Sequence, residues 1–225
     1  MCYLEHMADH GIVLRVDVDT PWEDLFSKIF VDADHGGYLR TARSTDGCVA
    51  QLVDHGKTKV PLTHWSKAES SVSASTGEAE FTALTLAVKR TALPLQDLLE
   101  LIFGVQSMLV EMNVDNPAAL AVGQSGISKQ LKYMAKHKKI RVGFVKEVFS
   151  EQNRGRILEK VATDENVADT LTKALDRKKH EYLTRAYGMC SKEEWDKMAL
   201  VVLLAMTNDD LEMIRTIFKL WGPKT

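Results

Sequence analysis

The sequence has few cysteines, little net charge and no long apolar run. Its three cysteines (Cys2, Cys48 and Cys190) are odd in number and lack metal-ligand spacing, which favours a reducing compartment over a disulfide-stabilised protein. A net charge of −2 excludes a globally basic surface, although the carboxylates of a metal site would offset local basic residues. The longest apolar stretch, 198–206, is too short to span a bilayer, and the N-terminal residues do not resemble a secretory signal. We therefore expect an intracellular protein that is not secreted and has no membrane partner.

The chain has the length and composition of a globular domain with a smaller appendage, with 225 residues of which 45% are hydrophobic and 27% charged. Alternating or apolar stretches followed by turn residues predict consecutive strands with short connections, and therefore an antiparallel meander. Helical spacing then alternates with two more strands, which predicts an α/β fold with a mixed five-stranded sheet flanked by helices. The predicted strands are 12–18, 28–37, 46–53, 59–66, 108–115 and 156–161, and the predicted helices are 75–88, 94–101, 116–122, 140–149, 164–173, 195–206 and 209–220.

Four carboxylates lie at predicted strand ends or on predicted helices: Asp32, Glu80, Asp115 and Asp169. Two-metal phosphodiester hydrolysis needs such a cluster, because Mg²⁺ prefers oxygen ligands and two ions must be held close together. The cluster would also need the cations, since four crowded anions repel one another.

Each acid also has an ordinary interpretation. Asp32 can simply terminate a strand, Asp115 can initiate an Asp-Asn-Pro turn, and Asp169 can face solvent from a helix. Glu78, two residues before Glu80, has capping-box spacing from Ser75 and so has a structural role of its own.

The sequence segments around these acids resemble the ribonuclease H domain of copia-type LTR retrotransposon polyproteins. The N-terminal residues resemble the tail of the reverse transcriptase that precedes this domain in the Pol polyprotein. The matching blocks are FVDADHGGYLRTARSTDGCVAQL (30–52), WSKAESSVSASTGEAEFTAL (65–84), VDNPAALAV (114–122), ENVADTLTKALDRKKHEYLTRAYGM (165–189) and MCYLEHMADHGIVLRV (1–16).

This resemblance implies a ribonuclease H-like fold and a magnesium-dependent endonuclease that hydrolyses the RNA strand of RNA–DNA hybrids. Asp32, Glu80, Asp115 and Asp169 would be its catalytic residues and the ligands of two Mg²⁺ ions, with Mn²⁺ as a substitute. The implied partners are the hybrid and a reverse transcriptase or integrase of the parent element, in the cytoplasm (in a virus-like particle) or in the nucleus. The expected segments are 1–24 (reverse transcriptase remnant), 25–189 (ribonuclease H domain) and 190–225 (helical extension of unknown role).

The basic residues between 129 and 141 predict contacts with the nucleic-acid backbone. The alternative interpretation is that they form a charged helix face exposed to solvent. Polar residues near the acids are further candidates, although capping explains Ser75 equally well. The predicted nucleic-acid-binding residues are Arg40, Arg43, Ser75, Asn116, Lys129, Lys132, Lys136, Lys138, Lys139 and Arg141.

The sequence departs from the family pattern at His35, where an aromatic residue is usual, which puts a packing or substrate contact in doubt. Residues 161–168 contain no histidine of the kind that assists product release in cellular ribonucleases H. Two other functions stay open: a catalytically weak remnant that binds nucleic acid or protein, and a resolvase or transposase core with the same fold.

Overall fold

The computed structural model describes residues 9–38, 40–126, 136–150 and 155–205, and the side chains of 136–140 and 199–205 are not described. The chain forms two compact units, Val13–Gly188 and a smaller one composed of Met1–Ile12 and Met189–Thr225. The predicted segment boundaries after residues 24 and 189 concern the origin of each segment and stay a prediction.

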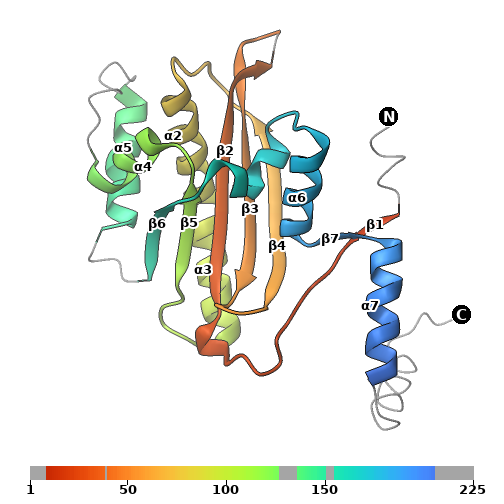
Figure 1. Ribbon diagram of the computed structural model, residues 1–225. Helices are drawn as coiled ribbons and strands as arrows, with labels where there is room; N and C mark the ends of the chain where they lie inside the picture. Colours follow the sequence, from red (N-terminus) through yellow and green to blue (C-terminus); the bar gives the residue numbers. More distant parts are fainter. Residues whose placement is uncertain (1–8, 39, 127–135, 151–154, 206–225) are drawn as a thin grey trace, which may run out of the picture. The chain divides into compact units, whose positions relative to one another are not determined.

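A mixed five-stranded sheet with strand order β4-β3-β2-β5-β6 forms the centre of the larger unit. Three long strands form the antiparallel meander, and two short strands add parallel to β2 on its other side (Figure 1). This confirms the predicted sheet of three antiparallel and two parallel strands, the arrangement of a ribonuclease H-like fold. The strands are β2 (Phe26–Tyr38), β3 (Arg43–Val53), β4 (Lys59–Ala68), β5 (Val110–Val114) and β6 (Arg156–Lys160).

The helices on one face of the sheet include two that run on into each other. α2 (Thr76–Ala87) continues through a π-helical turn, η2 (Val88–Ala92), into α3 (Leu93–Phe103). Pro94 lies in the first turn of α3 as predicted, where the backbone donor that it lacks is least needed. α4 (Pro117–Ser125) and α5 (Lys136–Val148) pack beside α2.

Apolar side chains of β2 point alternately to the two faces of the sheet and contribute to a hydrophobic core on each face. Ile29, Val31 and Ala33 belong to the main core, which α2, α4 and α5 complete. Phe30 faces the other side and packs in a second cluster with residues of η4 (Val167–Leu171) and α6 (Arg177–Tyr187). The period of two in a strand is the reason that one sequence segment serves both layers.

The predicted helix 164–173 is wrong. Two short 3₁₀ helices, η3 (Thr163–Glu165) and η4, occupy this segment, and Asn166 rather than Asp164 caps η4 through its bond with the Ala168 amide. Asn166 is fully buried and also donates to the Val31 carbonyl of β2 at 3.0 Å. This tertiary bond fixes the chain at a residue where a regular helix would have continued.

The predicted strand 12–18 is wrong as well. Only an isolated bridge between Arg15 and Lys59 pairs this segment with the sheet, and a 3₁₀ turn, η1 (Trp22–Asp24), follows. Leu14, Val16 and Val18 are all exposed, so their alternation does not cover a core.

The smaller unit contains a two-stranded antiparallel ribbon and one helix. β1 (His10–Ile12) pairs with β7 (Met189–Ser191), and α7 (Lys192–Ala205) follows. Ser191 and Glu194 form a reciprocal capping box at the start of α7, which confirms the helical pattern predicted to begin near Trp195. The pattern predicted at 209–220 lies outside the described residues. Within the described part of the chain, no helix combines the length and the apolar character needed to cross a membrane.

Candidate metal centre

Asp32 and Asp115 come together because their strands are parallel neighbours. The pair Val31 and Val114 is in register between β2 and β5, so Asp32 lies beside the carboxyl end of β5, where Asp115 follows. Asp32 was predicted to end its strand, but β2 continues beyond it to Tyr38. Asp32 is fully buried, and Asp115 is half-buried just beyond the end of β5. The sheet topology thus builds the first part of the site from two residues that are 83 positions apart.

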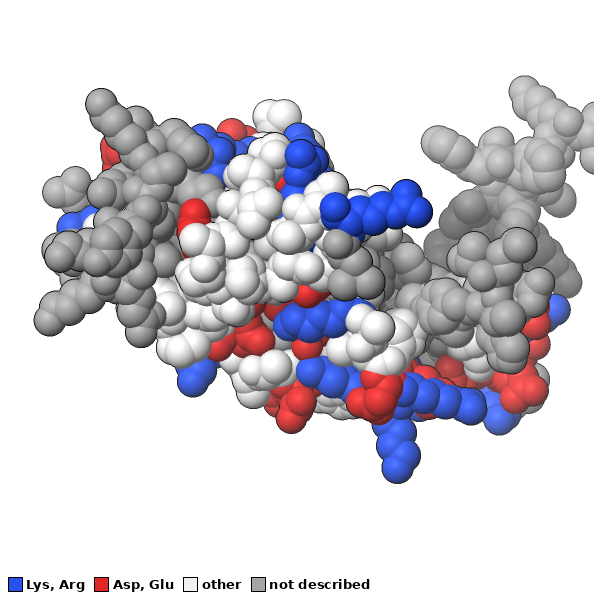
Figure 2. All heavy atoms as spheres, turned by 90° about the horizontal axis from the view of Figure 1, so that it is seen from above, with Lys and Arg blue, Asp and Glu red and all other residues white. Residues whose placement is uncertain are grey.

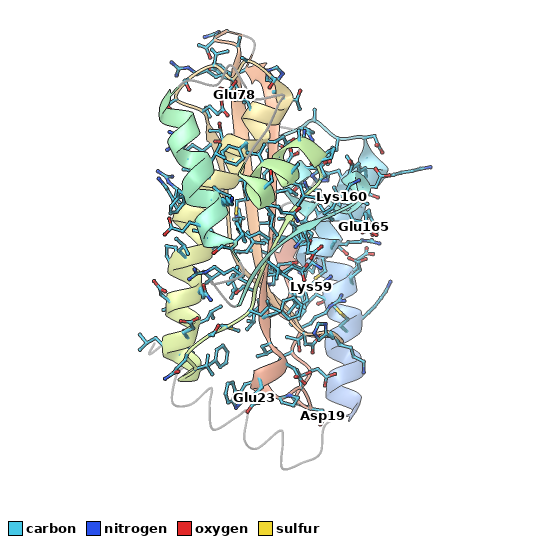
Figure 3. All side chains as sticks on the ribbon, turned by 90° about the vertical axis from the view of Figure 1, so that its left-hand side faces the viewer. Asp19, Glu23, Lys59, Glu78, Lys160 and Glu165 are labelled. Carbon is cyan, nitrogen blue, oxygen red and sulfur yellow. The ribbon has the colours of Figure 1, made fainter. Side chains whose placement is uncertain are left out.

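α2 brings the third carboxylate beside Asp32 and Asp115. The Ser75 hydroxyl accepts a hydrogen bond from the Glu78 amide and starts the helix, and Glu80 follows in its first turns. The Glu78 carboxylate accepts from the Ala74 amide, one residue before the capping residue Ser75, so Glu78 has a structural role at the start of the helix, as predicted. Figure 3 places Glu78 at one end of the sheet, with Asp19 and Glu23 at the opposite end.

Asp32, Glu80 and Asp115 form a compact group in which one oxygen from each lies within 4.8 Å of the others. The Oε2 atom of Glu80 and the Oδ1 atom of Asp115 are buried and have no hydrogen-bond partner. Unpaired buried carboxylate oxygens are costly, and a divalent cation would satisfy both. The donor set of three carboxylates also suits hard ions such as Mg²⁺ or Mn²⁺. The residues therefore fit a divalent metal.

The electrostatics of the group agree with this fit. Burial, together with the charges of Asp32 and Asp115, raises the pKa of Glu80 to about 9. Burial also raises the pKa of Asp32, although hydrogen bonds from Lys173 and Thr172 act in the opposite direction. Carboxyl groups hold their protons above the usual pH range when burial disfavours the charged form, and for Glu80 the neighbouring acids add to this effect. A metal ion would replace those protons.

Asp169, the fourth predicted ligand, is close to Asp32 but is held by lysines. The ammonium group of Lys173 donates to Asp32 Oδ1 at 2.8 Å and to Asp169 Oδ1 at 2.9 Å. Lys179 donates to the other oxygen of Asp169, Oδ2, at 2.8 Å. Both Asp169 oxygens thus have a cationic partner, and Asp169 does not belong to the group of three that the described residues form.

The Asp32 carboxylate has partners on both oxygens, because Thr172 donates its hydroxyl to Oδ2. Burial alone would lower the pKa of Lys173, but its hydrogen bonds to Asp32 and Asp169 more than offset this and raise it. The charged form of Lys173 is therefore favoured while it lies between these two carboxylates.

Thr172, Lys173 and Lys179 were not among the predicted site residues. Lys173 follows Asp169 by four residues, a spacing typical of ion pairs on helices, and this signal was available in the sequence. The contact of Thr172 with Asp32 joins residues 140 positions apart and has no such local signal.

The predicted nucleic-acid-binding residues have different positions in the structure: two cap helices, and two are exposed on a hairpin. Ser75 and Asn116 cap α2 and α4, since their side-chain oxygens accept from amides of those helices. Arg40 and Arg43 are exposed near the tip of the hairpin between β2 and β3. His35, at the unusual position, lies with its Nε2 atom 3.0 Å from the Ser73 carbonyl oxygen.

The basic segment is only partly described. Lys129 and Lys132 lie outside the described residues, and the backbone of α5 carries Lys136, Lys138 and Lys139, whose side chains are not described. Arg141 lines a cavity of about 140 Å³ together with Lys67 and Lys89. Viewed from above, the coloured part of the surface has basic and acidic side chains beside each other (Figure 2). The predicted basic track stays a prediction.

The comparisons with known proteins give structural likenesses only. No family model matches the chain, and no curated protein matches it. The similar solved structures include LC11-RNase H1 in complex with an RNA/DNA hybrid (20% identity, TM-score 0.44, 65% of this chain and 93% of that one). A second is RNase H1 from the halophilic archaeon Halobacterium salinarum (16% identity, TM-score 0.43, 65% of this chain and 93% of that one). A third is a foamy viral protease-reverse transcriptase in complex with dsDNA (17% identity, TM-score 0.40, 68% of this chain and 95% of that one). With TM-scores below 0.5, these likenesses carry no argument about activity, which has to rest on the site itself.

Proposed function

We propose that the chain is a divalent-metal-dependent endonuclease that hydrolyses the RNA strand of RNA–DNA hybrids. The copia-type retrotransposon origin is part of the same proposal and rests on the sequence blocks around the acids. The observation that carries it is the group formed by Asp32, Glu80 and Asp115, with two buried carboxylate oxygens that lack a partner.

The residues of the site have distinct roles in this proposal. Asp32, Glu80 and Asp115 would hold the first ion, and Asp169 would add the fourth carboxylate beside Asp32. Bound divalent ions would lower the pKa of the attacking water and stabilise charge on the leaving 3′ oxygen. Thr172 fixes the orientation of the Asp32 carboxylate through its hydroxyl. Burial of Asp32 and Glu80 keeps bulk water from the ligands, which strengthens every charge interaction there.

Substrate selection would depend on the form of the duplex. An RNA–DNA hybrid offers 2′-hydroxyls and an A-like minor groove, which distinguish the RNA strand from DNA. The exposed Arg40 and Arg43 at the hairpin tip, and the basic residues from 129 to 141, would hold phosphates. A polymerase or integrase of the parent element is the proposed protein partner, in the cytoplasm or nucleus.

Cleavage of a hybrid labelled on each strand in turn tests this function. With Mg²⁺, the wild-type chain is expected to cleave the RNA strand only, and Asp32→Asn and Glu80→Gln are expected to lose cleavage by at least about a hundredfold. Lys28→Met is the matched control, because Lys28 pairs with Glu111 on the same sheet outside the site. Folded wild-type protein that binds hybrid without cleaving it in Mg²⁺ or Mn²⁺ would contradict the enzyme and favour the nucleic-acid-binding alternative.

A further inference from the structure

The ammonium group of Lys173 bridges two buried carboxylates, Asp32 and Asp169, that belong to different elements. Asp32 comes from the central strand β2 and Asp169 from η4, and their side chains are 0% and 1% exposed. The ammonium group of Lys173 contacts one oxygen of each at 2.8 and 2.9 Å. Without it, two buried anions would face each other, which is costly unless a cation lies between them.

A second ion of a two-metal site would need the same oxygens. The first ion has the Glu80 and Asp115 oxygens that lack a partner, together with Asp32. A second ion bridged by Asp32 would have to take Asp169 as a ligand, and both Asp169 oxygens already accept from Lys173 and Lys179. A lysine ammonium and a divalent ion cannot occupy one place between two carboxylates.

We propose that Lys173 acts as a built-in cation that occupies the place of the second metal ion, so that this ion binds only by displacing it. The proposal rests on the proposed metal-dependent function and adds a step to it: the two ions bind in sequence. The first binds at Asp32, Glu80 and Asp115, where one Glu80 oxygen and one Asp115 oxygen lack a partner, and the second binds in competition with Lys173. Lys179 plays a lesser part, because it contacts Asp169 but not Asp32. Lys173 is a positioning residue in the metal-free chain, where it holds η4 against β2.

The lysine also has a way to leave. Its side chain is 34% exposed although both its partners are buried, so the ammonium group can move toward solvent without disturbing the core. The apparent affinity for the second ion is then its intrinsic affinity multiplied by the fraction of molecules in which Lys173 is displaced. A small displaced fraction therefore weakens binding of the second ion.

Calorimetric titration with Mn²⁺ tests the proposal on the full chain. Wild type is expected to bind one ion tightly and a second more weakly. Lys173→Met is expected to lower the dissociation constant of the weaker ion about tenfold or more, while the tighter one changes little. The melting temperature of the metal-free variant is expected to fall and to recover with Mn²⁺. Lys28→Met is the control, since Lys28 has the same 34% exposure and a single acidic partner at 2.9 Å.

A second measurement needs no variant. Acetylation of lysines in the wild-type chain, followed by mass spectrometry, is expected to show Lys173 protected without metal and reactive at the Mn²⁺ concentration that fills the second place. Lys28 in the same spectra serves as an internal reference. Equal affinities for both ions in wild type and Lys173→Met, or Lys173 reactivity independent of Mn²⁺, would overturn this proposal and leave the proposed function standing. Absence of any Mn²⁺ binding would overturn both.

Discussion

Gly47 of β3 is the cross-strand partner of Asp32 in β2. A Cβ atom at Gly47 would lie 2.6 Å from the Thr172 Cγ2 atom and 3.2 Å from the Ala168 carbonyl oxygen. The missing side chain therefore lets the segment from Ala168 to Thr172 approach the sheet closely. That approach is what brings Thr172 and Lys173 against the Asp32 carboxylate.

Gly47→Ala is expected to push this segment away from β3, because the contact atoms include backbone that cannot move freely. We expect a loss of roughly 1–3 kcal/mol of unfolding free energy, as for other overpacked sites, and a larger proportional loss of Mg²⁺-dependent cleavage. Denaturant unfolding and the hybrid assay measure the two effects. Gly143→Ala is the control, since a Cβ there meets nothing within 4 Å. A fully active and equally stable Gly47→Ala chain would contradict the close approach.

Asn166 anchors the same segment from its other end. Its side-chain amide donates to Val31 of β2 and its oxygen accepts from the Ala168 amide. Asn166→Ala is expected to cost about 1–3 kcal/mol, because it leaves a buried carbonyl unpaired. It is also expected to weaken Mn²⁺ binding, since Asp169 is displaced.

Gln96→Ala is the matched comparison for Asn166. Gln96 is equally buried and also bonds in two directions, to Met108 and Arg156, but its partners are not in the site. It is expected to lose similar stability with unchanged Mn²⁺ affinity per folded molecule. Equal metal affinities in both variants would show that Asn166 does not position Asp169.

The metal-free chain is expected to lose stability as pH rises. The pKa of Glu80 is raised from 4.5 to about 9 in the folded state, so between these values the folded chain holds a proton that the unfolded chain has released. The contribution of Glu80 to the free energy of unfolding is therefore greatest below about pH 4.5. It falls by at most about 1.4 kcal/mol per pH unit up to pH 9. Melting temperatures in chelator at several pH values measure the slope.

Glu80→Gln is expected to remove most of this slope, because the amide has no proton to release. Mg²⁺ is expected to flatten it in wild type by replacing the proton. A wild-type slope that Glu80→Gln leaves unchanged would show that another group carries the pH dependence.

Cys48 is expected to be chemically inert in the folded chain. Burial raises the pKa of its thiol to about 12, so the reactive thiolate is scarce near pH 8. Iodoacetamide is expected to leave the Cys48 peptide unmodified in native protein and to label it fully in denaturant, as read by mass spectrometry. Equal labelling in both states would mean that the β3 core opens readily.

The sheet and the acidic group were predictable because their signals are local. The apolar strands and the cap at Ser75 can be read in short windows, and the acids were selected by the family-like segments around them. The register between the parallel strands β2 and β5 then brings Asp32 and Asp115 together. The lysine contacts were not predicted, since Lys179 reaches Asp169 only through the turn between η4 and α6. The predicted helix 164–173 failed for a similar reason, because the buried bond from Asn166 to Val31 spans 135 positions.

A crystal structure with Mn²⁺, located by its anomalous signal, tests the metal centre most directly. We expect a first ion about 2.0–2.3 Å from carboxylate oxygens of Asp32, Glu80 and Asp115, as for a hard ion with oxygen ligands. At higher concentration we expect a second ion between Asp32 and Asp169, with the Lys173 side chain displaced. A metal-saturated crystal with no anomalous peak at the three carboxylates would contradict the metal centre and the function proposed from it.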